Sequence, residues 1–322
     1  MTMQTRRTAA EVELTEIGFG AAQLGSLYRE TTDEEARAAV DAAWEAGIRY
    51  FDTAPHYGIG LSERRLGEAL AGRDRDTYVL STKVGRLLVP TPELAAAGER
   101  DDDGFAVPAT HRRRWDFSRD GVLRSIEESL ERLGLDRIDI AYLHDPDQHW
   151  EAASTTGIAA LRELRDQGVV RAIGAGMNQS AMLARFVREC DVDVVMMAGR
   201  LTLLDRTAEE DLLPAAEEHG VSIVAAAVYN SGLLSRPEVP DDAKFDYDQA
   251  PPELLRRARR MAELCREAGV TLPDAAVQFP LRHPAVASVV VGVRTAEQVR
   301  STVERYRAVI PPELWTELEE IA

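Results

Sequence analysis

The stretch RYFDTAPHYGIGLSERRLG, residues 49–67, places a strand, a loop and a helix in immediate succession. Its first four residues are built around two aromatic side chains and end on Asp52, which predicts a strand that stops at a carboxylate. Pro, Gly and polar residues then indicate a loop that holds His56 and Tyr57, and a helix is expected from Ser62. Such a loop is either incidentally polar or part of a site, and the ends of the other strands decide between the two.

Strand-like segments recur along the whole chain, each followed by a helical pattern. Thr32 with Glu35 forms a capping-box pattern ahead of one helix, and Ser118 is placed to cap another. Strands that alternate with helices predict a parallel sheet. The eight candidate segments are VELTEIGFGAA, IRYFDT, TYVLSTKV, DIAYLH, VRAIGAG, VDVVMM, VSIVAAAVY and VASVVVG.

Eight such units in 322 residues predict an α/β fold of the (β/α)8 TIM-barrel type. We expect a single domain over residues 1–322, with an N-terminal hairpin and a C-terminal helix from Pro311. Long loops are expected after the third strand, over 86–117, and after the seventh, over 230–250. A doubly wound sheet is the alternative, but its glycine fingerprint is broken by Gln23, which stands at the third glycine of GFGAAQLG.

Composition narrows the classes of partner. The net charge of −17 argues against nucleic acid and anionic membranes, which leaves a small-molecule substrate. The only two cysteines, Cys190 and Cys265, fit reduced thiols better than a disulfide framework. The first residues lack a signal-peptide pattern, and no run of 18 apolar residues occurs, so a cytoplasmic location is expected. The oligomeric state is not predicted.

Chemistry-bearing residues follow three consecutive predicted strands. Asp52, Lys83 and His144 end the second, third and fourth strands, and Tyr57 follows Asp52 in the loop. In a barrel these ends converge on one mouth. A lysine beside a tyrosine favours the phenolate, a carboxylate neutralises the lysine, and a histidine can hydrogen-bond a substrate oxygen. Each residue alone has a structural explanation, but the set predicts proton transfer to or from an oxygen, with a cofactor supplying hydride.

These residues carry a family resemblance. FDTAPHYG, STKVG and YLHDPD resemble the aldo-keto reductase superfamily, whose catalytic tetrad of Asp, Tyr, Lys and His matches Asp52, Tyr57, Lys83 and His144. Further segments resemble the branch of bacterial L-fucose and D-threo-aldose 1-dehydrogenases, near pyridoxal 4-dehydrogenase and plant L-galactose dehydrogenase; they are DFSRDGVLRSIEESLERLGLDRIDI and YNSGLLS. The resemblance implies an NAD(P)-dependent enzyme that oxidises an aldose at C1 to a lactone. A pyridoxal or general aldehyde reductase or dehydrogenase is the alternative.

The resemblance also implies where the nicotinamide end of the cofactor is held. Asn178 matches the family's asparagine after the fifth strand, while Met177 replaces the serine before it. Ala198 and Leu201 stand where the family has a glutamine and a tyrosine after the sixth strand. Tyr229 is the candidate to stack on the nicotinamide.

The remaining cofactor candidates lie in two loops. Ser231, Gly232 and Leu233 could donate backbone N–H groups to the pyrophosphate, and Gly292, Arg294 and Gln298 surround a helix start that suits an anion. Thr295 with Gln298 also resembles an ordinary capping pair. Gln298 replaces the arginine of many NADP-dependent members. A 2′-phosphate prefers paired cations, so NAD or dual use is expected rather than strict NADP dependence.

The substrate pocket is expected to use the loops, with Tyr28, His56, Trp115 and Phe117 as candidates for packing on a sugar. Two other classes of protein remain as alternatives. A metal-dependent barrel hydrolase could collect ligands from one group of residues, namely His56, His144, Asp145, Asp147 and His149. That alternative lacks a His-x-His pair in the first strand and leaves Lys83 unexplained, so no metal site is predicted. A non-catalytic cofactor-binding subunit is the other, and the intact tetrad argues against it.

Overall fold

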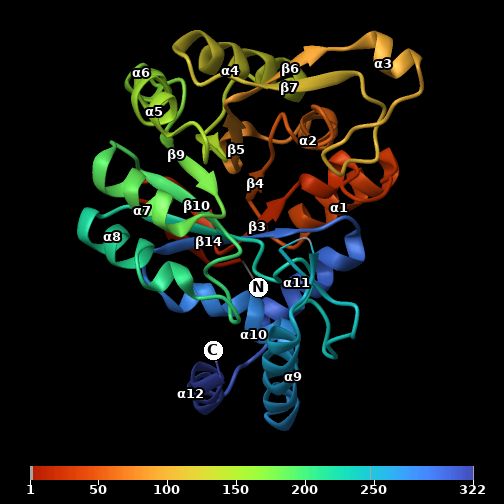
Figure 1. Cartoon of the computed structure of the whole chain (residues 1–322), viewed down its shortest axis with the longest axis vertical. Coiled ribbons are helices and arrows are strands. Elements are labelled where there is room, and N and C mark those ends of the chain that lie inside the picture. The colour runs from red at the N-terminus through yellow and green to blue at the C-terminus, as the bar shows by residue number, and fades with distance from the viewer. Residues whose placement is uncertain (1–2, 247, 322) are drawn as a thin grey trace.

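The computed structural model describes residues 3–246 and 248–321. Eight parallel strands close into a barrel in the order in which they occur in the chain, which confirms the predicted (β/α)8 architecture. Figure 1 shows the helices surrounding these strands. The barrel strands are β3 (Ile17–Gly20), β4 (Tyr50–Asp52), β5 (Val79–Val84), β8 (Ile140–His144), β9 (Ala172–Met177), β10 (Val194–Ala198), β11 (Ser222–Ala226) and β14 (Val286–Gly292).

One helix of the outer layer follows each barrel strand. These helices are α1 (Asp33–Glu45), α2 (Leu61–Leu70), α4 (Arg119–Leu133), α6 (Ile158–Asp166), α7 (Ser180–Glu189), α8 (Leu212–His219), α10 (Leu272–Gln278) and α11 (Ala296–Arg307). The predicted starts of α1 and α4 are confirmed. Thr32 and Glu35 form a reciprocal capping box, and Ser118 accepts a hydrogen bond from the Gly121 N–H.

Further elements decorate the barrel. The additional helices are α3 (Pro92–Ala96), α5 (Trp150–Ala152), α9 (Pro252–Glu267) and α12 (Pro312–Ile321). Short turns are the 3-10 segments η1 (Ala22–Gly25), η2 (Arg75–Thr77), η4 (Thr207–Glu209) and η5 (Phe279–Arg282), and the π-helical turn η3 (Ala153–Gly157). In Figure 1, α9 and α12 lie at the end of the molecule opposite α3, and α12 packs against α9.

The barrel interior holds its own apolar core. Inward-facing side chains of the strands, including Tyr50, Tyr142 and Met196, form one buried cluster. Val12 and Leu14 complete that cluster from the N-terminal hairpin, whose strands are β1 (Thr5–Arg7) and β2 (Glu13–Thr15). Because the amino ends of the strands are packed in this way, the open space of the barrel lies at their carboxyl ends.

Two segments expected as long loops contain structure. Residues 86–117 form an antiparallel pair, β6 (Arg86–Pro90) with β7 (His111–Trp115), joined through α3. No residue of β7 (sequence HRRRW) is buried, so the strand has no alternation that a periodicity analysis could detect. The stretch 230–250 carries a small hairpin of β12 (Lys244–Phe245) and β13 (Asp248–Gln249).

Strand register brings the predicted site residues to one end. Asp52 pairs with Ser81, two residues before Lys83, and His144 pairs with Gly176. Residues two apart on a strand face the same side, so Ser81 and Lys83 both point inward beside Asp52. The mouth of the barrel therefore receives side chains from β4, β5 and β8 together.

Candidate active site

A cavity of about 800 Å³ opens at the carboxyl ends of the strands. It is lined by Asp52, Tyr57, Lys83 and His144, the four residues predicted from the strand ends. Asp52, Lys83 and His144 come directly from β4, β5 and β8, and Tyr57 from the loop after β4. The structure thus gathers the whole predicted set around one space.

The loop that carries Tyr57 is held by a close backbone contact. Gly58 has φ +61°, and a Cβ there would lie 2.3 Å from the carbonyl oxygen of Gly25. Only glycine allows both the positive φ and this approach. The packing of loop 57–59 on η1 therefore sets the position of Tyr57.

Lys83 and Asp52 form an ion pair that is removed from solvent. The Lys83 Nζ lies 2.6 Å from Asp52 Oδ2, and the two side chains are 2% and 3% exposed. Lys83 also donates to the Thr53 carbonyl oxygen at 3.0 Å, and Ser81 donates to Asp52 Oδ1 at 2.7 Å. Because both carboxylate oxygens are bonded, the lysine has a fixed position under the cavity.

This pair controls the charge next to Tyr57. Burial alone disfavours the ammonium, but Asp52 and Tyr57 raise the pKa of Lys83 above its ordinary value, so it stays charged. Burial raises the pKa of Tyr57, while the charge of Lys83 and its hydrogen bond to the phenol lower it. The lysine acts in the expected direction, yet the net pKa shift of Tyr57 is upward, because burial outweighs it.

Two histidines beside Tyr57 are held neutral. Burial, followed by the charge of Arg86, lowers the pKa of His144 well below its ordinary value. The same two causes lower the pKa of His56 to about 2. The ring centroid of His144 lies 5.8 Å from that of Tyr57 and 5.4 Å from that of His56. A neutral imidazole can donate one hydrogen bond to a substrate oxygen without carrying a charge.

An arginine and a carboxylate lie beside these histidines, and the sequence analysis did not assign either of them to an oxidoreductase site. Arg86, at the start of β6, forms an ion pair with Asp145, which directly follows His144. Its Nη1 lies 3.3 Å from His56 Nδ1, and its guanidinium stacks 4.3 Å from the Trp115 ring. Only their closeness in sequence to two predicted catalytic residues could have pointed to them. Arg86 is three residues beyond Lys83, and Asp145 is one beyond His144.

Of the four substrate candidates, two line the cavity. Tyr28 and His56 do, together with Phe105, which the sequence did not single out. Trp115 and Phe117 are outside the lining and stack on each other with centroids 5.8 Å apart. Phe117 is buried where Gly85 leaves room for its ring, so it serves packing, and Trp115 covers it and Arg86. The packing of these two residues does not support a substrate contact, and that role stays a prediction.

Some of the cofactor candidates line the cavity, and others are bonded within the fold. Asn178, Tyr229, Ser231, Gly232 and Gly292 line the cavity on the side of β9, β11 and β14. The backbone N–H groups of Gly232 and Leu233, however, are bonded within the turn, to the carbonyls of Tyr229 and Asn230. This corrects the expectation that Gly232 and Leu233 offer these groups to a pyrophosphate.

Arg294 and Gln298 are used by the fold. The Arg294 side chain is buried and donates to the carbonyl oxygens of Leu27 and Arg29 and to Thr31. Gln298 accepts from the Arg294 N–H at 2.7 Å and its own N–H bonds Thr295, the capping pair foreseen as the alternative. Arg294 therefore anchors loop 27–31 rather than facing a phosphate, which corrects its predicted role.

One wall of the cavity carries a polar group that suits a bound ligand. Gln23 extends over Gly292, where a Cβ would lie 2.7 Å from its amide nitrogen. The Gln23 Oε1 is buried and has no hydrogen-bond partner in the part of the chain that the structure describes. An orphaned amide oxygen in a glycine-lined wall fits a ligand that brings its own donor. Among the family's cofactor positions, Ala198 lines the cavity and Leu201 is buried.

The alternative metal site is not assembled. Within residues 3–246 and 248–321, the ligand atoms of Asp101, Asp102 and Asp103 are the three found within 4.8 Å of one another. Asp101 and Asp103 form ion pairs with Arg113, and Asp103 lines the cavity. The histidines and carboxylates proposed as metal ligands are not gathered into a comparable group among the described residues.

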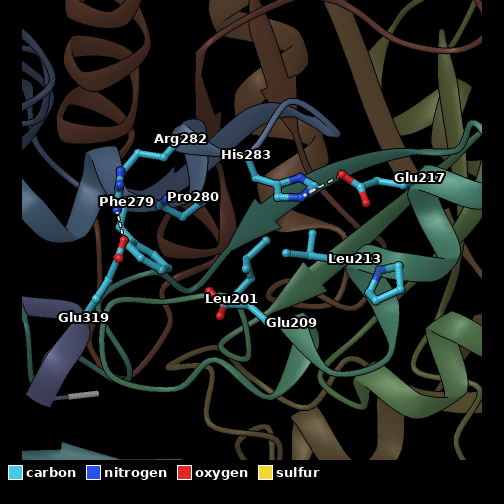
Figure 2. A pocket seen from close by; sticks show the side chains of 10 residues that line it. Leu201, Glu209, Leu213, Glu217, Phe279, Pro280, Arg282, His283 and Glu319 are labelled. Carbon is cyan, nitrogen blue, oxygen red and sulfur yellow. Dashed lines mark hydrogen bonds and ion pairs between the residues drawn. The ribbon is translucent and has the colours of Figure 1, made fainter. Parts of the chain in front are cut away.

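A second hollow of about 380 Å³ lies between α8, η5 and α12 (Figure 2). Its charged groups pair with each other: Arg282 with Glu319, and His283 Nε2 with Glu217 Oε1 at 3.3 Å. Leu201 and Phe279 supply apolar walls. None of the predicted site residues lines this hollow within the described chain, so the barrel mouth is the candidate active site.

A family model described as "Aldo/keto reductase family" matches residues 16–322. The chain belongs to the aldo/keto reductase family. This aldo/keto reductase is 50% identical to a D-threo-aldose 1-dehydrogenase from Pseudomonas sp., over 97% of this chain and 95% of that protein. It is 40% identical to a pyridoxal 4-dehydrogenase from Microbacterium luteolum, over 95% and 93% of the two chains.

A solved structure is similar as well. The holo form of an aldo-keto reductase from Bacillus halodurans matches with a TM-score of 0.76 and 29% identity, covering 99% of this chain and 96% of that one. These likenesses confirm the family and the barrel, and they make the protein an oxidoreductase with a nicotinamide cofactor. No described helix combines the length and apolar character that a membrane crossing needs.

Proposed function

We propose that this aldo/keto reductase, acting as a single domain, oxidises an aldose at C1 to a lactone. The observation that carries the proposal is the buried Lys83–Asp52 pair beneath Tyr57, in a cavity whose remaining walls carry His144, His56 and Asp145. A polar and aromatic pocket of this kind suits a pyranose, which has both C–H and O–H faces. The 50% identity to a D-threo-aldose 1-dehydrogenase supports this substrate class.

The four residues have separate tasks in the proposed reaction. A nicotinamide cofactor, when bound, would supply the acceptor for the hydride of C1. The Tyr57 phenolate takes the proton of the C1 hydroxyl, so that the bonds lost are C–H and O–H and a carbonyl remains. Lys83 stabilises the phenolate, Asp52 holds Lys83 in place, and neutral His144 donates a hydrogen bond to the reacting oxygen.

Because the pKa of Tyr57 is raised, the rates of oxidation and reduction should depend on pH in opposite ways. Oxidation needs the phenolate and reduction needs the phenol. Turnover in the oxidative direction should therefore rise as the pH approaches the raised pKa of Tyr57, whereas reduction should fall over the same range.

We propose NAD, or NAD together with NADP, as the cofactor. In this proposal Asn178, Tyr229 and the unpaired amide oxygen of Gln23, all in the wall of the cavity, hold the cofactor. Arg294 supports the proposal because its guanidinium is already bonded to backbone carbonyls and is not free to pair with a 2′-phosphate.

A cofactor-reduction screen tests both proposals. Aldoses, pyridoxal and simple alcohols are offered with NAD and NADP side by side, and NAD-linked turnover of an aldose is expected. Pyridoxal turnover without aldose turnover would replace the proposed substrate, an outcome that the 40% identity to a pyridoxal 4-dehydrogenase makes worth including. Tyr57→Phe should lower turnover by about 10²- to 10⁴-fold with cofactor binding kept, and near-normal turnover would refute its role.

A further inference from the structure

Asp145 faces the reacting centre from the end of β8. It directly follows His144 and lines the same cavity as His144 and Tyr57. Its N–H bonds the Gly176 carbonyl oxygen at 2.9 Å, which fixes the backbone where the strand ends. None of the proposed steps of the reaction uses this carboxylate.

The backbone at Asp145 adopts a left-handed conformation. Its φ is +41°, in the left-handed region that residues with a Cβ adopt rarely. A conformation of this kind persists when the surrounding structure holds it, and such residues gather at ligand sites. Here it follows directly on His144, and the Asp145 carboxylate lies in the cavity wall beside that imidazole.

The two oxygens of the Asp145 carboxylate differ in whether they have a partner. Oδ2 pairs with Arg86, whereas Oδ1 has no hydrogen-bond partner in the described part of the protein. The side chain is 36% exposed, and the cavity is the space that it faces. Burial raises the pKa of the Asp145 carboxyl, and the charge of Arg86 opposes that rise. The ion pair with Arg86 also fixes the orientation of the carboxylate, so Asp145 presents an acceptor to a ligand.

The distance to His144 limits what that acceptor can bind. His144 Nε2 lies 3.6 Å from Asp145 Oδ2, the oxygen that Arg86 also holds, and Oδ1 belongs to the same carboxylate. With hydrogen bonds of about 2.8 Å on each side, two groups this close reach oxygen atoms on adjacent carbons of one ligand. If His144 holds the reacting oxygen, the Asp145 carboxylate meets the hydroxyl on the next carbon.

We propose that Asp145 is a specificity-determining residue that accepts a hydrogen bond from the hydroxyl next to the reacting carbon, so that the enzyme selects aldoses hydroxylated at C2. This inference rests on the proposed aldose oxidation and assigns it a substrate class. His56 does not compete for this hydroxyl, because the Arg86 guanidinium lies against its ring nitrogens.

The test compares L-fucose with 2-deoxy-L-fucose in cofactor reduction. Wild-type protein should favour L-fucose in kcat/KM by about tenfold to a hundredfold, the range for a hydrogen bond to a charged group. Asp145→Gly removes the carboxylate and suits the positive φ, and it should bring the ratio close to one, mainly by raising KM for L-fucose. Asp145→Asn keeps the shape and should give an intermediate ratio.

Asp147→Asn is the matched control, because it removes a carboxylate of the same loop that lies outside the cavity lining. Its ratio should equal that of the wild type. A wild-type ratio near one, or an unchanged ratio in an active Asp145→Gly or Asp145→Asn, overturns the role of Asp145 while aldose oxidation stands. Absence of wild-type turnover with every aldose of the cofactor-reduction screen overturns the proposed function itself, and the inference with it.

Discussion

Asp52→Asn is the change that most directly tests how the buried ion pair works. At 2.6 Å, with both side chains nearly unexposed, two unit charges attract by about 6 kcal/mol at an effective dielectric constant of about 20. Desolvation of several kcal/mol per ion offsets much of this attraction in the intact pair. The asparagine variant loses the attraction but keeps Lys83 buried, so unfolding should become easier by about 3–5 kcal/mol.

Deprotonation of the lysine sets a ceiling on that cost. Bringing an ammonium with an ordinary pKa near 10.4 to the neutral form at pH 7 costs about 5 kcal/mol, since each pK unit is about 1.4 kcal/mol. In the variant the folded-state pKa of Lys83 falls below its unfolded value, so the unfolded chain binds more protons between the two. Stability should therefore rise with pH from 7 towards 10.

Urea unfolding at pH 7 and pH 9.5 measures this effect. Asp139→Asn is the control, because Asp139 is equally buried and lies 2.6 Å from Arg75, whose guanidinium does not deprotonate in this range. It should be destabilised at both pH values alike. An Asp52→Asn variant as stable as the wild type, or one with no recovery at pH 9.5, would show that Lys83 is not held charged by Asp52.

Three further outcomes are expected. Because the pKa values of His56 and His144 are lowered in the folded protein, the unfolded chain takes up protons first on acidification. Stability should therefore be lost below pH 6.5, by about 2 kcal/mol per histidine at pH 5. In chemical unfolding, His56→Gln should make stability depend less steeply on pH, and an unchanged slope contradicts this explanation. Arg294→Met should lower the melting temperature yet leave the NAD-to-NADP ratio of KM unchanged, since its partners are carbonyls of loop 27–31; a ratio shifted towards NAD would restore a phosphate-binding role. Gly58→Ala should destabilise by at least about 1 kcal/mol and reduce turnover because it displaces Tyr57, and full activity at wild-type stability would argue against that contact.

Local patterns in the chain were enough to predict the barrel. Eight strand-like segments with helices between them can be recognised in the sequence, because alternation and capping are properties of neighbouring residues. Asp52, Lys83 and His144 could be placed together for the same reason, since the ends of parallel strands in a closed sheet share one mouth. Thr32 and Ser118 cap their helices as their sequence context indicates.

The tertiary structure determined which partner each side chain has. Arg294 had the right charge for a phosphate, but the fold brings it under loop 27–31, more than two hundred and sixty positions away in the chain, where carbonyl oxygens bind it. Phe117 was a plausible sugar platform until Gly85 proved to leave room for its ring. Contacts of this kind join distant parts of the chain and leave no local periodicity.

The pKa of Tyr57 shows the same division. The sequence by itself determined that a lysine and an aspartate would stand near this phenol at the end of the strands. The depth of burial, which raises the pKa more than Lys83 lowers it, depends on how loop 57–59, η1 and Phe105 close around the ring. Residue identity sets which charges are present, and packing sets how much water remains to screen them.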